Sequence, residues 1–103
     1  MRTAIQNKNT LMSELVANKQ AIHAFGVSKL SIFGSFASGK SKEDSDVDFL
    51  VEFDPALKNY DNFIGLSFYL EYLLGRKVEL VTPQSLSKYI GPYILNQAED
   101  VAI

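Results

Sequence analysis

The segment 46–53, DVDFLVEF, constrains the fold of this chain more than any other part of its sequence. Apolar residues alternate along it with a second set, which contains Asp46, Asp48, Leu50 and Glu52. A period of two is typical of a β-strand, because successive side chains point to opposite faces of a sheet. The segment therefore predicts a strand that buries Val47, Phe49, Val51 and Phe53 on one face.

Helical and extended patterns alternate along the rest of the chain. The spacing of apolar residues predicts a helix over 10–25, capped by Asn9 or Thr10 and stopped at Gly26, and a second helix from Asp61 or Asn62 to Leu74. Short apolar runs predict strands over 29–33 and 77–81. Thr82-Pro83 indicates a helix start, and one or two helical turns are expected after Pro92. The predicted order α-β-(short α)-β-α-β-α favours an α/β fold with a small mixed β-sheet backed by helices.

Composition narrows the class of protein. The chain has 103 residues, which suits a single domain over 1–103, and it contains no cysteine, so disulfide scaffolds and thiolate metal sites are excluded. Its net charge of −2 lacks the basic excess of proteins that bind nucleic-acid phosphates, so nucleic acid is an unlikely partner. The most apolar stretch, 63–74, is too short to cross a bilayer, and residues 1–10 contain no apolar signal region. We expect a soluble cytoplasmic protein.

Residues 34–41, GSFASGKS, satisfy the P-loop pattern G-x-x-x-x-G-K-[ST] and follow a predicted strand. In a P-loop, Lys40 would contact phosphates and Ser41 would bind magnesium, in a nucleoside triphosphatase. A P-loop lysine and serine open a long crossover helix, however, and here only KEDS separates them from the strand that begins at about Asp46. A P-loop is therefore the less favoured interpretation.

Asp46 and Asp48 lie two residues apart on the predicted strand, with Cα atoms about 7 Å from each other on one face. Two carboxylates so placed repel each other, and bound divalent cations would relieve the repulsion. The alternative is a solvated strand end, because KEDSD is charged throughout.

The combination of motifs is more specific than either one. Gly34-Ser35, ten further residues, Asp46-x-Asp48 and the carboxylate Glu79 in a third strand resemble the minimal nucleotidyltransferase family of the DNA polymerase beta-like nucleotidyltransferase superfamily. The resemblance covers nearly the whole chain, including GSFASGKSKEDSDVDFLVEF, the apolar helix, RKVELVTP and YIGPYIL.

The resemblance implies a role for each matching residue. Gly34 and Ser35 would hold the β- and γ-phosphates of a nucleotide, and Asp46 and Asp48 would bind two Mg²⁺ ions. Glu79 would bind one metal ion and help to deprotonate the attacking hydroxyl. The family commonly has arginine at position 38 and aspartate at position 79. With Ser38, either a phosphate contact would be lost or Lys40 or Lys42 would replace it, and Glu79 is one methylene longer.

The resemblance also implies a function. Members of the family commonly act as antitoxins beside a HEPN-domain toxin, and they can transfer AMP from ATP to a tyrosine of that toxin. We expect the same Mg²⁺-dependent transfer here, in a homo- or hetero-oligomer. One alternative is a weakened nucleotide-binding antitoxin that acts by docking alone.

Two further groups of residues have alternative roles. The consecutive C-terminal residues Tyr93, Ile94 and Leu95 would either contribute to the partner surface or cover their own sheet. The cations Arg76 and Lys77 would either end a helix or steer a triphosphate.

Overall fold

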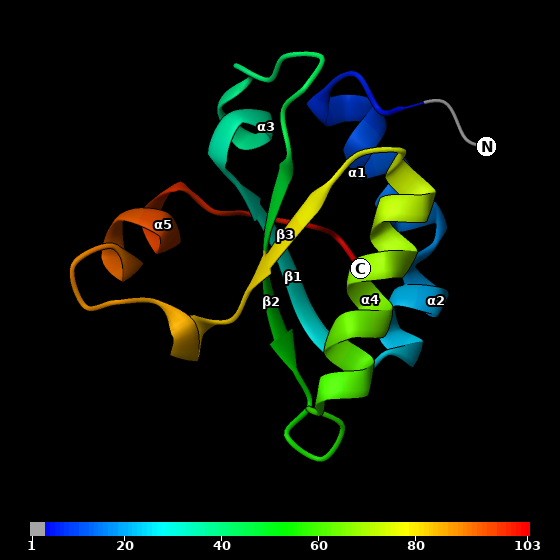
Figure 1. Cartoon of the computed structure of the whole chain (residues 1–103), viewed down its shortest axis with the longest axis vertical. Coiled ribbons are helices and arrows are strands. Elements are labelled where there is room, and N and C mark those ends of the chain that lie inside the picture. Colours follow the sequence, from blue (N-terminus) through cyan, green and yellow to red (C-terminus); the bar gives the residue numbers. More distant parts are fainter. Residues whose placement is uncertain (1–3) are drawn as a thin grey trace.

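The computed structural model describes residues 4–103, in which helices and strands alternate (Figure 1). In chain order the elements are α1 (Lys8–Ala17), α2 (Lys19–Ala24), β1 (Val27–Phe33), α3 (Gly34–Ser38), β2 (Val47–Phe53), α4 (Tyr60–Leu74), β3 (Val78–Val81), a 3₁₀ turn (Pro83–Ser85), α5 (Gly91–Gln97) and β4 (Glu99–Asp100).

The four strands form one mixed sheet in the order β3-β2-β1-β4. Strand β1 is antiparallel to β2 and to β4, and β2 is parallel to β3. The predicted fold, a small mixed sheet backed by helices, is confirmed. Strand β4 was not predicted, because a strand of two exposed residues carries no alternation that a pattern could reveal.

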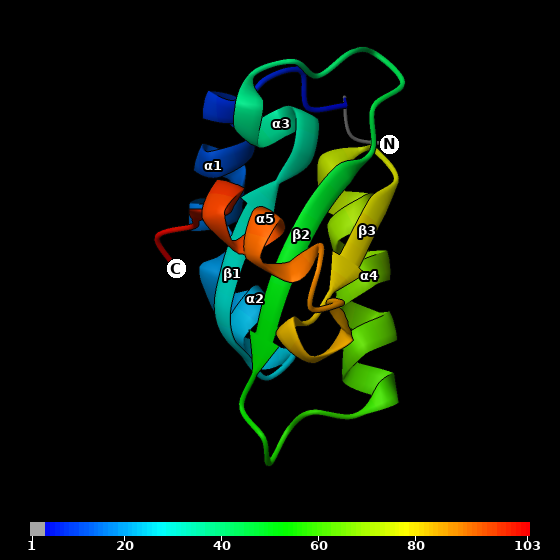
Figure 2. The ribbon, with the colours of Figure 1, turned by 90° about the vertical axis from the view of Figure 1, so that its left-hand side faces the viewer.

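Helices cover the two faces of the sheet unequally. Helices α1, α2 and α4 pack on one face, whereas α5 lies on the opposite face (Figures 1 and 2). The alternating residues of β2 that were predicted to be buried do lie in the core, with Leu11, Leu15, Leu66 and Leu70 of the helices. Asp48 and Leu50 therefore point toward the side of α5.

The predicted single helix over 10–25 is wrong, because the chain forms two helices that meet at Asn18. The Asn18 side chain donates to the Glu14 carbonyl (2.8 Å) and accepts from the Tyr69 hydroxyl (3.3 Å). Such side-chain bonds compete with the helical backbone pattern. The first helix also begins earlier than predicted, with Asn7 as its N-cap, and α4 is capped by Asn59 instead of Asp61 or Asn62.

Thr82-Pro83 starts only a 3₁₀ turn, in which the Thr82 and Ser85 side chains form a capping box. The C-terminal prediction of one or two helical turns is confirmed by α5. Within residues 4–103, no helix has both the length and the apolar character that crossing a membrane would require.

Candidate active site

The turn between β1 and α3 lies directly beside the start of β2. Phe33, the last residue of β1, pairs with Asp48, so Gly34 follows at the level of the aspartate. Gly34 has φ 72°, and a Cβ atom added to it would lie 3.2 Å from Asp48 Cγ and closer still to Oδ2. Glycine is therefore required at position 34 for two reasons, its left-handed backbone and its close approach to the Asp48 carboxyl group.

The two predicted metal-binding aspartates occupy different environments. Asp48 is half-buried in β2, and Asp46 is exposed in the loop one residue before the strand begins. Burial is the main cause, and together with the nearby charges of Glu79 and Asp46 it raises the pKa of the Asp48 carboxyl from 3.8 to about 6. The charged form of Asp48 is thus disfavoured by its surroundings, as expected of acidic groups held together.

Glu79 comes next to Asp48 through the parallel pairing of β2 and β3. The register places Glu79 opposite Asp48, and the charge of Glu79 helps to raise the pKa of the Asp48 carboxyl. Strand β3 is also an edge strand, on which Glu79 is exposed to solvent. The edge position exposes the Glu79 carboxylate, and the register directs it toward Asp48.

The three carboxylates are not arranged around one point. Among residues 4–103, no group of three His, Cys, Asp or Glu side chains is placed to hold a metal ion by itself. This arrangement still fits Mg²⁺ bound with a nucleotide, because Mg²⁺ commonly takes only one or two carboxylates together with phosphate oxygens. Hard carboxylate oxygens are also the donors that Mg²⁺ prefers.

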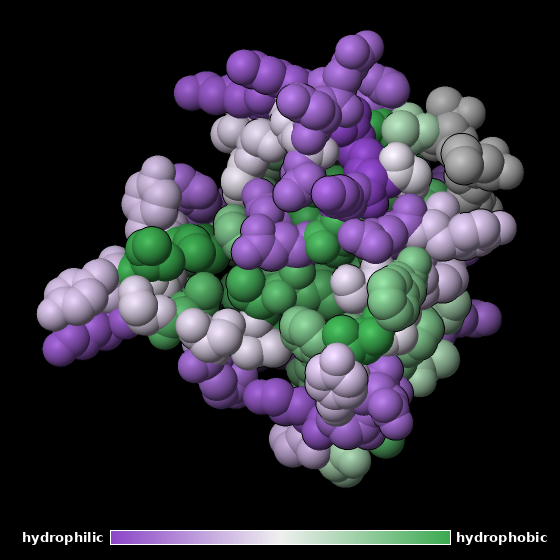
Figure 3. All heavy atoms as spheres, in the orientation of Figure 1, coloured by the Kyte–Doolittle hydropathy of each residue, from purple (hydrophilic) through white to green (hydrophobic). Residues whose placement is uncertain are grey.

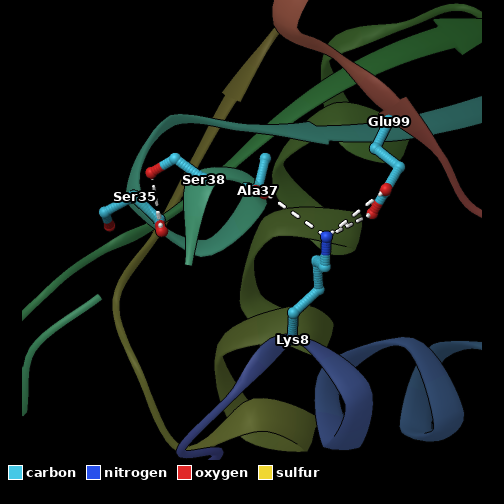
Figure 4. Close-up of polar contacts among 5 residues, drawn as sticks. All are labelled: Lys8, Ser35, Ala37, Ser38 and Glu99. Atoms are coloured by element: carbon cyan, nitrogen blue, oxygen red, sulfur yellow. Dashed lines mark hydrogen bonds and ion pairs between the residues drawn. The ribbon is translucent and has the colours of Figure 1, made fainter. Parts of the chain in front are cut away.

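Helix α3 carries the other predicted residues. Phe33, its N-cap residue, has no polar side chain to cap the first amides, so the turn at Gly34 and Ser35 offers N–H groups near Asp48. Ser38, which stands where the family has arginine, donates its hydroxyl to the Ser35 carbonyl (3.2 Å, Figure 4). Lys40 is exposed beyond the end of α3, and its side chain makes no hydrogen bond or ion pair with residues 4–103.

The structure contradicts the P-loop interpretation. Helix α3 has five residues and ends at Gly39, so Lys40 and Ser41 follow the helix instead of opening it. The strands before and after it are antiparallel neighbours, which need no crossover helix.

Arg76 is the residue whose place the sequence did not indicate. Only 8% of it is exposed, so it neither lies on the surface as a helix-end cation nor reaches toward a triphosphate. Its guanidinium group donates to backbone carbonyls of the loop before Asp46. No pattern in the sequence distinguishes such an arginine from the exposed Lys77 beside it.

Comparisons with known proteins agree with this geometry. The model of the nucleotidyltransferase domain family matches residues 14–103. The chain is 43% identical over 86 residues to the protein adenylyltransferase MntA of Thermococcus cleftensis, covering 82% of this chain and 86% of the relative. It also resembles a solved structure provisionally described as a minimal nucleotidyltransferase, with a TM-score of 0.82, 29% identity and coverage of 94% and 98% of the two chains.

A third comparison shows the fold alone. A crystal structure described as a toxin–antitoxin with AMP-PNP aligns with a TM-score of 0.64 at 23% identity, covering 93% of this chain and 73% of that one. The family model spans most of the chain and includes the Gly34 turn, the aspartate strand and β3. This chain belongs to the nucleotidyltransferase domain family.

Proposed function

We propose that this protein is an antitoxin that transfers AMP from ATP to a hydroxyl group, a tyrosine of a partner HEPN-domain toxin. The observation that carries the proposal is the half-buried Asp48, held against Glu79 and Asp46 beside the open Gly34 turn. The likeness to a relative named a protein adenylyltransferase supports the reaction, and the likeness to a toxin–antitoxin structure with AMP-PNP supports the partner and the nucleotide.

The chain's own residues suit each part of this reaction. The amides of Gly34 and Ser35 would bind the β- and γ-phosphates, and exposed Lys40 would add a cation beside them. Asp46, Asp48 and Glu79 would hold Mg²⁺, which neutralises phosphate charge and aligns the attack when it is bound.

The acceptor oxygen attacks the α-phosphorus, the bond between the α-phosphorus and the bridging oxygen breaks, and pyrophosphate leaves with that oxygen. A carboxylate takes the hydroxyl proton, and Glu79 is well placed for this because it is exposed beside Asp48.

Exposed apolar residues supply a surface for the partner. Tyr89, Ile90, Tyr93 and Leu95 are each more than half exposed, and they lie in and just before α5. Figure 3 shows hydrophobic side chains gathered over this part of the molecule, below a hydrophilic region around α3 and the loop after it. Exposed aromatic residues that surround an apolar patch are typical of protein interfaces. Since α5 lies on the same side of the sheet as Asp48, a toxin bound there would reach the site.

The test is transfer of label to a HEPN-domain toxin supplied as the partner protein. ATP labelled at the α-phosphate should label the toxin and release pyrophosphate, whereas ATP labelled at the γ-phosphate should not label it. Release of inorganic phosphate without labelled toxin would contradict the proposal.

Lys40→Ala should reduce transfer less than 10-fold, because Lys40 only assists the α3 amides. Neutralisation of the toxin without label, by both the wild type and Asp48→Asn, would instead establish docking alone.

The partner surface has its own test. Tyr93→Ala should weaken binding of the toxin about 10-fold or more, because a truncated aromatic anchor is costly at an interface. Tyr60→Ala is the matched control, since Tyr60 is 76% exposed but belongs to α4 on the opposite side of the sheet. Equal binding by the wild type and both variants would exclude α5 as the interface.

A further inference from the structure

Arg76 is a buried cation that is compensated by backbone carbonyls. It lies between the end of α4 and the start of β3, and its Nη1 donates to the carbonyls of Lys42 (3.0 Å), Glu43 (2.8 Å) and Ser45 (3.0 Å). Within residues 4–103 no carboxylate forms an ion pair with it. A charge that leaves water needs such partners, so these carbonyls stabilise the guanidinium group in place of an acid.

Two further contacts tie Arg76 to the rest of the site. Its Nε donates to the carbonyl of Ile5, and its guanidinium carbon lies 5.1 Å from the centroid of the Phe36 ring in α3. One side chain therefore joins the N-terminal segment, the loop before β2 and the helix that follows Gly34. A planar guanidinium group can do this because its donors point in several fixed directions.

Hydrogen bonds to residues 76 and 77 hold the backbone on both sides of Asp46. Arg76 holds the carbonyl of Ser45, immediately before Asp46, and the amide of Val47, immediately after it, donates to the carbonyl of Lys77 (2.9 Å). Asp46 itself lies outside the strand and is exposed, so β2 does not hold its backbone from both sides. The peptide groups on both sides of the aspartate are thus attached to residues 76 and 77.

We infer that Arg76 is a positioning residue for Asp46, which it places beside Asp48 by holding the 42–45 loop. The inference rests on the proposed function, because Asp46 matters only as a ligand of the metal–nucleotide complex. It assigns Arg76 no contact with substrate. The side chain acts through the backbone of Ser45, and its burial leaves it unsuited to meet a triphosphate directly.

The test compares Arg76→Met, Arg76→Lys and a control, Lys77→Met, which removes the neighbouring exposed cation but keeps the Lys77 carbonyl. Affinity for Mn²⁺ is measured by electron paramagnetic resonance in the presence of α,β-methylene-ATP, which cannot transfer AMP. Hydrogen exchange of the Ser45 and Val47 amides is measured on the same variants, since Ser45 N donates to the Lys42 carbonyl within the held loop.

We expect Arg76→Met to lower Mn²⁺ affinity about 100-fold and Arg76→Lys about 10-fold, within the range seen when groups that orient metal ligands are removed. The lysine retains charge near the three carbonyls but cannot also reach Ile5. Exchange of the two amides should accelerate in the same order, and Lys77→Met should match the wild type in both measurements.

Three outcomes separate the positioning role from the proposed function. A folded Arg76→Met that binds Mn²⁺ as tightly as the wild type and keeps slow amide exchange would overturn the positioning role. If Arg76→Met does not fold, unchanged Mn²⁺ affinity in Arg76→Lys would overturn it. A wild-type protein that binds no Mn²⁺ with the nucleotide analogue would instead overturn the proposed function, and the positioning role with it.

Discussion

Acidic side chains lie near both edges of the sheet, on β4 at one edge and on β2 and β3 at the other, but only those on β4 are paired with lysines. On strand β4, Glu99 pairs with Lys8 (3.3 Å) and Asp100 pairs with Lys29 (3.7 Å), while Ser31 donates its hydroxyl to Asp100 (2.8 Å). Lys8 also donates to the Ala37 carbonyl at the end of α3 (Figure 4). We call Glu99 and Asp100 the paired edge, because each carboxylate has a cation.

The other group consists of Asp46, Asp48 and Glu79, which we call the acidic cluster. Glu79 and Asp46 both lie near enough to Asp48 to raise its pKa, and among residues 4–103 none of the three forms an ion pair with a lysine or arginine. Arg76 lies close by, yet it binds carbonyls instead of these acids. The lack of a cation beside the acidic cluster supports the proposal that it binds a metal ion, whereas the carboxylates of the paired edge already have lysine partners.

The largest expected effect comes from removing one charge of the acidic cluster. Asp48→Asn should lower AMP transfer at least about 10³-fold, because the amide loses a metal ligand while keeping the side-chain shape. Glu99→Gln, which removes a charge from the paired edge, should leave transfer unchanged. The measurement is the initial rate of toxin labelling. Near-normal transfer by Asp48→Asn would mean that the two groups of acids do not differ in function.

The second effect concerns the geometry that brings the Gly34 turn to the acidic cluster. Gly34→Ala should lower transfer about 100-fold, since its Cβ would displace the Asp48 carboxyl by roughly 1 Å. Gly39→Ala is the matched control, because Gly39 has a similar φ of 77° but open space around the added Cβ.

Both alanine variants should lose about 1 kcal/mol of stability from the left-handed backbone, and only Gly34→Ala should lose activity. Equal transfer by the two variants would show that the close contact with Asp48 has no role. Their unfolding free energies, measured by urea denaturation, show how much stability the contact with Asp48 costs Gly34→Ala beyond the backbone cost that both variants share.

The sequence predicts the acidic cluster better than the paired edge. Asp46 and Asp48 stand out because two acids lie two residues apart among the alternating apolar residues of segment 46–53, and Glu79 stands out because it is the charged residue within VELV. The parallel pairing that brings Glu79 to Asp48 has no local signature, because strand direction depends on contacts between distant segments. The ion pairs of Glu99 and Asp100 are equally hidden, since Lys8 and Lys29 are far away in the sequence.

Two sequence-based predictions fail because of hydrogen bonds made by a single side chain, which a periodic pattern does not reveal. Asn18 divides the predicted helix 10–25 through bonds to Glu14 and Tyr69, one of which crosses to α4. Arg76 is hidden for the same reason, because its partners are carbonyls of residues 5 and 42–45, which any sequence would supply. Periodicity reports which face is buried and does not report which polar groups meet there.

The third prediction concerns the effect of Glu79 substitutions on the rate of AMP transfer. Glu79→Gln should lower kcat for AMP transfer about 10-fold with little change in nucleotide affinity, because taking the acceptor proton matters only near the transition state. Glu79→Asp should also impair transfer if the site is adapted to the longer side chain. A rate above that of the wild type in Glu79→Asp would identify an eroded position, and normal rates in both variants would remove Glu79 from the chemistry.

The smallest effect is a pH dependence of stability that arises from Asp48 of the acidic cluster. In the metal-free protein the Asp48 pKa is about 6, above the usual 3.8 that applies after unfolding, so the folded state holds the proton more tightly. Its contribution is therefore favourable at pH 4 and is lost as the pH rises through 6. Since Asp48 is partly exposed and screened by solvent, we expect a loss of about 1 kcal/mol.

The measurement is the difference in unfolding free energy between the wild type and Asp48→Asn, in chelator, at pH 4.5 and pH 7.5. Asp48→Asn should be the more stable protein at pH 7.5, and the gap should narrow at pH 4.5. Glu99→Gln, whose carboxylate is paired with Lys8, should show no such gain at the higher pH. Adding Mg²⁺ and nucleotide at pH 7.5 should stabilise the wild type and not Asp48→Asn, because only the ionised cluster binds the metal. Parallel pH curves for the wild type and Asp48→Asn would mean that burial and the neighbouring acids do not raise the pKa of Asp48, and the contrast with the paired edge would then have no energetic basis.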